Sequence, residues 1–159
     1  MIVYHGSFMV VDHPDVLHSY QALDFGKGFY VTTVKEQAER WARRKADLIG
    51  KGIATVNQYQ MKEPSAPLRV KTFDEDLAEW IDFVCRCRDG ENIYQGYDCI
   101  IGKVAKDKVF RVVDMYRMGI WEKERALQEI RVYPNYDQIA FNTQNAIDQL
   151  LIFESSYEV

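Results

Sequence analysis

The segments with strand-like and helix-like patterns follow one another irregularly along this chain, and their order constrains the fold more than any other feature. Strand patterns are expected at residues 2–4, 29–32, 52–61, 67–73, 97–105, 136–143 and 150–159. Helical patterns are expected at residues 34–49, 74–90, 107–118, 121–131 and 143–149, with Asp74 capping the second helix and Pro14 opening a short helical turn at about 14–18. Neighbouring strands without a regular strand–helix–strand alternation indicate an α+β domain rather than a doubly wound sheet.

The helix expected at residues 34–49 has the clearest local signals. Thr33 and Glu36 have the spacing of a capping box, and Gly50 follows the last periodic residue. A buried apolar face is expected from the residues at helical spacing, which are Val34, Ala38, Trp41, Ala42 and Leu48.

The segment "YDQIAFNT" at residues 136–143 alternates with period two. Ile139 and Phe141 are expected on one face of a strand, with Gln138 and Ala140 on the other. Only one of the two faces is expected to pack against the core. Thr143 is expected to cap the short helix that follows.

Length and composition indicate a single domain over residues 1–159 of a soluble protein. Apolar residues make up 47% and charged residues 28%, and there is no apolar run long enough to span a membrane. The first residues, "MIVYHGSF", lack the basic start of a signal peptide, so we expect a cytoplasmic protein. The three cysteines have no metal-site spacing and are expected to be reduced, buried thiols: Cys85, Cys87 and Cys99.

The net charge of −4 argues against a protein that binds duplex nucleic acid nonspecifically. One basic cluster falls inside the helix expected at 34–49, where we interpret it as the solvated face: Arg40, Arg43, Arg44 and Lys45. A nucleotide with two phosphates needs only one or two cations, so a nucleotide ligand stays compatible with this charge.

Three short segments together resemble the signature of the ADP-ribosyltransferase superfamily: "YHGS" at residues 4–7, "DFGKGFY" at 24–30 and "YDQIAF" at 136–141. They are most similar to the clade of poly(ADP-ribose) polymerases and diphtheria toxin, whose His, Tyr and Glu triad lies on three separate strands. The middle segment is the most specific match, and the order and spacing of all three agree. The chain is also similar, over most of its length, to a small bacterial family of uncharacterised domains.

The resemblance implies a split β-sheet core around an NAD cleft, with flanking helices. It implies a mono-ADP-ribosyltransferase that moves ADP-ribose from NAD to a macromolecular target and releases nicotinamide, as a toxin or defence effector. A slow NAD glycohydrolase is a variant of this activity. NAD is then the substrate and no metal is required. The expected partners are NAD, a macromolecular acceptor and an antitoxin or regulator protein, with no membrane.

The resemblance also assigns the site residues. It places His5, Tyr30 and Gln138 at the catalytic positions, and it implies that NAD is bound by His5, Gly6, Ser7, Gly28, Tyr30, Thr32 and Trp41. The three segments are expected to converge on one groove lined by the three catalytic side chains.

Physical chemistry gives reasons for several of these residue types. Gly6 has no side chain, so its backbone N–H and C=O can approach the nicotinamide carboxamide closely. Tyr30 offers a large rigid face for stacking on the ring, and Trp41 is placed to offer a second. His5 is expected to hold a ribose hydroxyl, with Ser7 adding a hydrogen bond. The plainer interpretation is that the aromatic residues belong to the core and that the histidine ends an edge strand.

The glycines of the middle segment are expected to have a structural role. Gly26 and Gly28 are expected to allow the tight turn that delivers Tyr30, whereas Lys27 is expected in solvent rather than on the pyrophosphate.

The third segment departs from the family pattern, because Gln138 stands where the family has a catalytic glutamate. The amide keeps a hydrogen bond to the ribose but loses the carboxylate's attraction for oxocarbenium-like charge, a loss that typically costs about 10²- to 10³-fold in rate. Asp137 is expected on the opposite face of the strand. Asp98 and Glu154 are the candidates for a compensating acid.

A second departure is Ala38, at the position of a serine that binds the carboxamide in the polymerases. Thr32, Thr33 and Gln37 are the candidates to replace it. Both departures keep a second function open, in which the chain is a catalytically weak or inactive module that binds NAD, ADP-ribose or another protein.

Overall fold

The strands form two sheets in the computed structural model, which describes residues 1–19, 23–73, 77–105, 107–133 and 136–159. Sheet A has the order β1-β3-β7, with bounds Ile2–Ser7, Thr55–Met61 and Leu151–Glu158. Sheet B has the order β2-β6-β5-β4, with bounds Phe29–Val31, Asp137–Phe141, Cys99–Lys103 and Val70–Thr72. Neighbouring strands are antiparallel except for β4 and β5, which are parallel.

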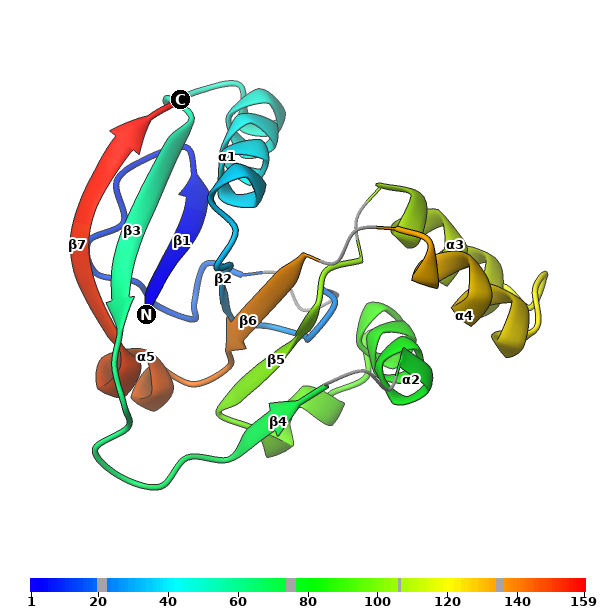
Figure 1. The fold of residues 1–159 in the computed structure, drawn as a ribbon. Helices are drawn as coiled ribbons and strands as arrows, with labels where there is room; N and C mark the ends of the chain where they lie inside the picture. Colours follow the sequence, from blue (N-terminus) through cyan, green and yellow to red (C-terminus); the bar gives the residue numbers. More distant parts are fainter. Residues whose placement is uncertain (20–22, 74–76, 106, 134–135) are drawn as a thin grey trace.

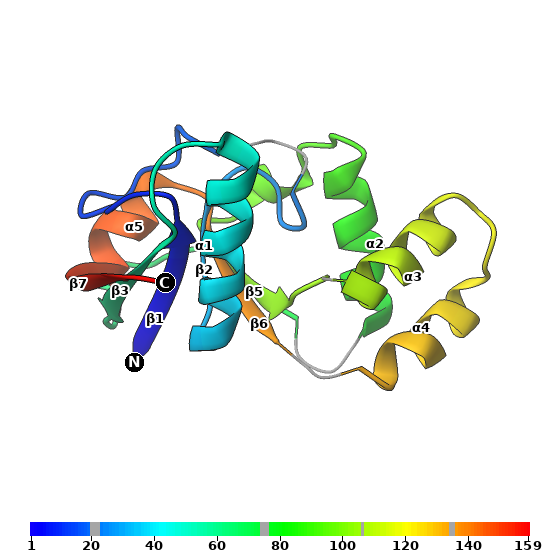
Figure 2. The same cartoon turned by 90° about the horizontal axis from the view of Figure 1, so that it is seen from above.

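The helices lie in groups around these sheets (Figures 1 and 2). α1 lies beside β1, α5 lies near the start of β7, and α2, α3 and α4 lie at the end of the molecule far from sheet A. Their bounds are Lys35–Ile49, Leu77–Arg88, Asp107–Arg117, Lys123–Arg131 and Gln144–Leu150 for α1 to α5, with a 3₁₀ turn η1 at Ile93–Gly96. The prediction of an α+β fold is confirmed.

Three local predictions meet different outcomes. Residues 14–18 form bends and a turn instead of the expected helical turn. The cap expected at Asp74 falls outside the described residues. Thr143 does cap α5 as predicted, because its side chain accepts a hydrogen bond from Ala146 N.

Three apolar clusters hold the elements together, and we name them by position. The inter-sheet cluster packs sheet A against sheet B and α5, and includes Val3, Phe29, Val31, Ile139, Phe141 and Ile147. The helical cluster packs α2, α3 and α4 against the opposite face of sheet B, and includes Trp80, Val84, Ile100, Val113, Ile130 and Ala140. The α1 cluster is smaller and packs Ala38 and Ala42 against Val56 and Tyr4 of sheet A.

The two sheets are joined by a backbone bridge between Tyr4 of β1 and Thr32, directly after β2. Directly opposed residues of antiparallel strands carry their side chains on one face. Tyr4 packs with α1, while Tyr30, two residues from Thr32, packs with the helical cluster. The face of sheet A under α1 therefore continues as the face of sheet B under α2, α3 and α4, and the inter-sheet cluster lies behind it.

The strand β6 is buried on both faces, which corrects the expectation that only one face packs. It lies between β2 and β5. Ile139 and Phe141 point into the inter-sheet cluster and Ala140 into the helical cluster, so the predicted alternation is right but both directions lead into a core. Gln138 is only 3% exposed, although its strand face was expected not to pack against the core.

The helix α1 begins without the predicted capping box. Its N-cap is Val34, and the hydroxyl of Thr33 donates to Asp137 instead of capping the helix. The predicted end is confirmed, because Gly50 has φ +69° and its N–H donates to Ala46 O. Leu48, expected on the buried face, is 79% exposed, so the prediction is wrong for this residue.

The described part of the chain contains no helix long and apolar enough to cross a membrane. Cys85, Cys87 and Cys99 are free and buried, as the sequence predicts. Burial raises the pKa of the Cys85 thiol to about 11 and those of Cys87 and Cys99 to about 12, so all three are protonated at neutral pH.

Substituting Gly6 tests the packing of α1 on β1. A methyl group at Gly6 would overlap the carbonyl oxygen of Ala38 and lie 2.6 Å from Ala42 N, both of them helix backbone atoms. We expect Gly6→Ala to lower the free energy of unfolding by about 1–3 kcal/mol, the usual cost of overpacking. Urea denaturation measures this, with Gly96→Ala as the control, because nothing lies within 4 Å of that position. Equal stability of the two variants would contradict the packing described.

Candidate functional site

The strands β1 and β2 stop pairing directly after the Tyr4–Thr32 bridge, and we call this place the split. Tyr4 N donates to Thr32 O at 2.8 Å and Thr32 N to Tyr4 O at 2.9 Å. A continued antiparallel ladder would next pair Gly6 with Tyr30, but Tyr4–Thr32 is an isolated bridge. Backbone groups of alternate strand residues point to the same side, so the N–H and C=O of Gly6 point toward β2 and away from β3.

His5 occupies the split from the side of the inter-sheet cluster. Its Nδ1 lies 2.6 Å from the carbonyl oxygen of Tyr30, and its ring stacks on Phe29 with centroids 4.2 Å apart. A carbonyl only accepts, so Nδ1 carries the proton and Nε2 is the acceptor. Burial, and then the charge of Lys45, lowers the pKa of His5 well below 6.5, so the ring is neutral at physiological pH.

Lys45 of α1 lies at the other end of the same imidazole. Its Nζ is 3.5 Å from His5 Nε2, with the ammonium group as the donor and the neutral ring nitrogen as the acceptor. Lys45 is half-buried, unlike its exposed neighbours Arg43 and Arg44, so its interpretation as part of a solvated face is wrong. Burial lowers the pKa of Lys45 to about 8.

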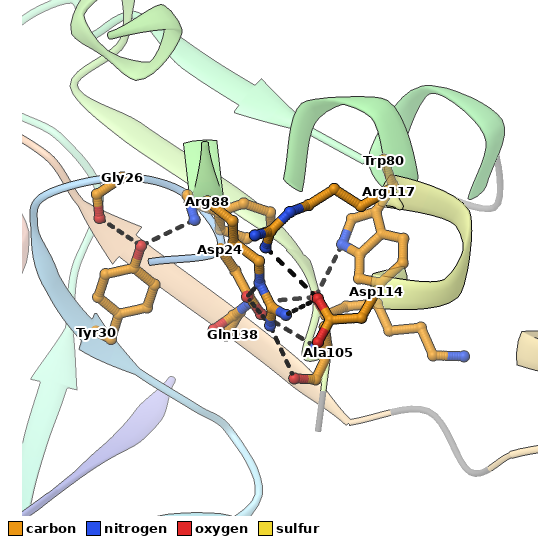
Figure 3. Close-up of polar contacts among 11 residues, drawn as sticks. Asp24, Gly26, Tyr30, Trp80, Arg88, Ala105, Asp114, Arg117 and Gln138 are labelled. Carbon is orange, nitrogen blue, oxygen red and sulfur yellow. Dashed lines mark hydrogen bonds and ion pairs between the residues drawn. The ribbon is translucent and has the colours of Figure 1, made fainter. Parts of the chain in front are cut away.

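Tyr30 lies on the opposite face of β2 from Phe29, and its hydroxyl is fixed by the preceding loop (Figure 3). The hydroxyl donates to Gly26 O at 2.6 Å and accepts from Phe25 N at 2.9 Å. Gly26 has φ +76°, so the tight turn predicted there is confirmed. Burial, and then the charge of Asp24, raises the pKa of Tyr30 well above its ordinary value, which keeps the hydroxyl protonated.

Gln138 lies on the same face as Tyr30, where a buried polar network holds its amide (Figure 3). Its Nε2 donates to Asp24 Oδ2 at 3.0 Å and to the carbonyl oxygen of Lys103 at 3.2 Å. Asp24 also accepts from Ala105 N at 3.1 Å and from Arg88, at 2.8 Å from Nε and 2.5 Å from Nη2. Both amide hydrogens of Gln138 are therefore used within the protein.

The network ties the helices to sheet B. Arg88 is the last residue of α2, and its guanidinium stacks 3.9 Å from the ring centroid of Phe110 on α3. Its Nη1 lies 3.9 Å from Asp114 Oδ1 and has no hydrogen-bond partner among the described residues. The carboxylate beside Gln138 thus carries a charge that Arg88 balances.

The three expected catalytic side chains meet only in part. His5 contacts the backbone of Tyr30, whereas the ring of Tyr30 and the amide of Gln138 lie on the other face of sheet B. The reason is strand alternation: His5 shares its face with Val3, and Tyr30 shares its face with Ala140. Gly6, Tyr30 and Gln138 share one continuous face, and His5 reaches the split from behind it.

Thr32 was expected to bind NAD, but the structure uses all of its polar groups internally. Its hydroxyl donates to Asp137 Oδ1 at 3.0 Å and accepts from Val34 N at 3.1 Å, and its backbone forms the bridge to Tyr4. Thr33 also donates to Asp137, through both its N–H and its hydroxyl. Asp137 thus points away from Gln138, as predicted, and anchors the start of α1.

The remaining expected ligand-binding residues lie around the split with differing access. Trp41 is half-buried, and its Cβ lies 2.8 Å from the position of a methyl group on Gly6. Ser7 is buried at the end of β1. Gly28 packs against the end of β6 farthest from Gln138, and its N–H donates to Ser19 Oγ at 3.0 Å, so its amide is not open to a ligand.

The residues expected to compensate for the two departures are also occupied. Gln37 is buried and accepts from Arg40 at 2.9 Å, so it does not replace the serine missing at Ala38. Asp98 pairs with Arg69 and accepts from Thr143, at the other end of β5 from Gln138. Glu154 is exposed and accepts from Gln58 across sheet A.

A surface pocket of about 450 Å³ lies away from the split, between residues 12–15 and α5. Its lining includes carboxylates from three aspartates and no lysine or arginine: Asp12, His13, Pro14, Asp15, Gln144, Ile147, Asp148, Leu151 and Phe153. Carboxylates repel phosphate groups, so this pocket is a poor match for a dinucleotide.

Two residues of the site were not predicted, Asp24 and Lys45. Lys45 follows Ala38 by seven positions and Trp41 by four, a spacing that places it on the same helix face as both. That signal was present in the sequence. Asp24 contacts Gln138 only because the loop before β2 folds over β6. No local sequence pattern predicts such a contact.

One family model matches this chain. Its description is "Protein of unknown function (DUF3990)", and it covers residues 1–152, which include β1, β2 and β6 around the split. No curated protein and no solved structure matches the chain.

Replacing Gln138 by glutamate tests the polar network. Gln138→Glu brings a second carboxylate to within hydrogen-bond distance of Asp24 in a buried site, so one of the two must take up a proton. We expect the free energy of unfolding to fall by about 1–3 kcal/mol at pH 8, and by less at pH 5.

The exposed Gln95→Glu is the matched control, and it should change stability by no more than about 0.5 kcal/mol at either pH. In the double variant Asp24→Asn/Gln138→Glu the loss should be smaller than the sum of the single losses, because one carboxylate again faces Arg88. Additive losses would show that the two side chains do not contact each other.

The burial of His5 predicts a stability that depends on pH. Its pKa in the folded state is below the unfolded value of about 6.5, so unfolding takes up a proton between those two values. The free energy of unfolding should therefore fall as pH drops below about 6.5, by at most about 1.4 kcal/mol per pH unit.

Urea titrations between pH 5 and 8 measure this slope, and His5→Gln should remove its histidine part. His13, whose side chain is 92% exposed, provides the control, because His13→Gln should leave the slope as it is in the wild type. The same slope in the wild type and in His5→Gln would contradict the neutral buried imidazole.

Proposed function

The chain belongs to the family described as "Protein of unknown function (DUF3990)", and from the resemblance of its three segments to the ADP-ribosyltransferases, together with their arrangement at the split, we propose that it binds NAD there and transfers ADP-ribose to a macromolecular target, releasing nicotinamide. The observation that carries the proposal is the position of Gly6 opposite Tyr30, where the two strands stop pairing. The family resemblance predicts that Gly6 and Tyr30 contact nicotinamide. They come from segments far apart in the sequence, and the bridge at Tyr4 brings them together.

The backbone at the split supports recognition of a carboxamide. Gly6 directs one donor and one acceptor toward β2, and a primary carboxamide offers the complementary acceptor and donor. Trp41 lies over Gly6 from α1, and the half-buried ring of Tyr30 lies on the same continuous face. A flat, uncharged heteroaromatic ring with a carboxamide fits both the polar and the aromatic parts of this arrangement.

The order of strands supports the finer fold proposal of a split sheet like that of the ADP-ribosyltransferases. The three motif segments lie on β1, β2 and β6, which are consecutive across the joined sheets. We propose a transferase that modifies single sites rather than one that builds polymers, because Gln138 has no carboxylate. A toxin or defence effector, with an antitoxin or regulator protein as partner, is the biological role that we propose for such an activity.

The burial of Gln138 favours a second candidate function. Its amide hydrogens are committed to Asp24 and Lys103, and Arg88 balances the adjacent carboxylate, so neither charge nor a free amide is directed at a ribose. A module that binds NAD or ADP-ribose without fast chemistry satisfies this arrangement equally well. Turnover therefore separates the two candidates, and binding does not.

The transferase proposal is tested by measuring nicotinamide release from NAD, with and without candidate acceptors. We expect slow release by the wild type and a loss of about 10-fold or more in kcat/KM for Trp41→Ala, because stacking on an aromatic ring is typically worth about 1–3 kcal/mol. Tyr30→Phe should keep the ring and most of the activity, whereas Tyr30→Ala should lose it.

Trp121→Ala is the matched control, since Trp121 is also half-buried but packs with the helical cluster and Arg125. NAD binding without any nicotinamide release would select the binding module. Equal losses in Trp41→Ala and Trp121→Ala would contradict a ring site at the split.

A further inference from the structure

Lys45 is the basic residue of α1 whose surroundings differ from those of its neighbours. Arg43 lies 4.0 Å from Glu39, and Arg40 donates to Gln37 and stacks over Tyr136. No carboxylate in the described ranges forms an ion pair with Lys45, whose Nζ has His5 Nε2 as its described contact, at 3.5 Å.

This arrangement leaves a half-buried ammonium group without a balancing charge. Removing a charge from water costs free energy unless an opposite charge or enough hydrogen bonds replace the solvent. His5 does not balance the charge, because its Nδ1 proton is held by the carbonyl of Tyr30 and the ring is neutral. The lowered pKa of Lys45, about 8, reflects the same burial. No group among the described residues thus offsets the free-energy cost of burying the charge of Lys45.

We infer that Lys45 is the anion-binding residue of the split and that it takes a phosphate group of the bound nucleotide. This inference rests on the proposed nucleotide site, because the phosphates are the negative groups that NAD offers. One of the three Nζ hydrogens faces His5 Nε2, which leaves two donors for phosphate oxygens. His5 thereby acts as a positioning residue that aims the ammonium group, and its own link to Tyr30 fixes both to the place where the nicotinamide is proposed to bind.

Calorimetric titration with inorganic pyrophosphate, ADP-ribose and nicotinamide tests this inference on the full chain. We expect Lys45→Gln to weaken pyrophosphate and ADP-ribose about 10- to 100-fold, the range for a lost hydrogen bond to a charged group, and to leave nicotinamide unchanged. Lys45→Arg should keep most of the affinity. The exposed Lys51→Gln makes the same change of charge nearby and should change nothing.

Unchanged affinity in Lys45→Gln, an equal loss in Lys51→Gln, or no pyrophosphate binding by the wild type would each overturn the inference. Urea denaturation of Lys45→Gln provides a second readout, since the amide removes an unbalanced charge and should leave the protein as stable as the wild type or more stable. A marked loss of stability would instead assign Lys45 a structural role.

Failure of the anion site can be distinguished from failure of the proposed transferase. If ADP-ribose binding depends on Lys45 but NAD releases no nicotinamide, the transferase fails and the anion site stands. If NAD is turned over with the same KM in Lys45→Gln, the anion site fails and the transferase stands.

Discussion

The backbone bridge between Tyr4 and Thr32 determines how the two sheets meet and where the candidate site lies. It joins two sheets at a point where the chain must also leave β2 and enter α1, and α1 lies so close to β1 that only glycine fits at position 6. The next pair of a continued ladder, Gly6 and Tyr30, does not form. His5 fills part of the resulting space by donating to the carbonyl that the ladder leaves unpaired.

A second constraint acts from the other side of the same strand. Asp24, Arg88 and Gln138 connect the loop before β2, the end of α2 and the centre of β6 in one buried network. Removing one of these side chains would leave a buried charge or amide without its partner. The network therefore stabilises the contact between the helices and the sheet. It also explains how glutamine is suited to position 138: a neutral amide donates to Asp24, where a carboxylate would repel it. The glutamine at this position thus has a structural explanation in the two hydrogen bonds that its Nε2 donates.

Much of the fold could be predicted from the sequence wherever the signal is local. The end of α1 at Gly50, the cap at Thr143 and the turn at Gly26 depend on a few neighbouring residues, and all three are confirmed. The positions of β2 and β6 also follow from their own composition. The start of α1 did not follow, because Asp137, more than a hundred residues away, takes the hydroxyl of Thr33 from the helix.

The candidate site was less predictable, because its geometry depends on which strands become neighbours. Alternation places Gln138 and Ala140 on one face, but only the packing of α2, α3 and α4 against that face makes it a core. The same alternation turns His5 to the opposite face from Tyr30, which three motifs in a linear sequence do not reveal. Lys45 looks like one charge among several on a helix, and only its contact with His5 distinguishes it.

The proposed function requires that the split, where the N–H and C=O of Gly6 point toward β2, binds a pyridine carboxamide. Titration of ¹⁵N-labelled protein with nicotinamide, followed by amide chemical shifts, tests it most directly, because the N–H of Gly6 is itself the proposed donor. We expect the largest shifts at Gly6, Tyr30 and Trp41, with little change in α5. Shifts confined to the acidic pocket beside α5, or no shift at Gly6 at saturating nicotinamide, would contradict it.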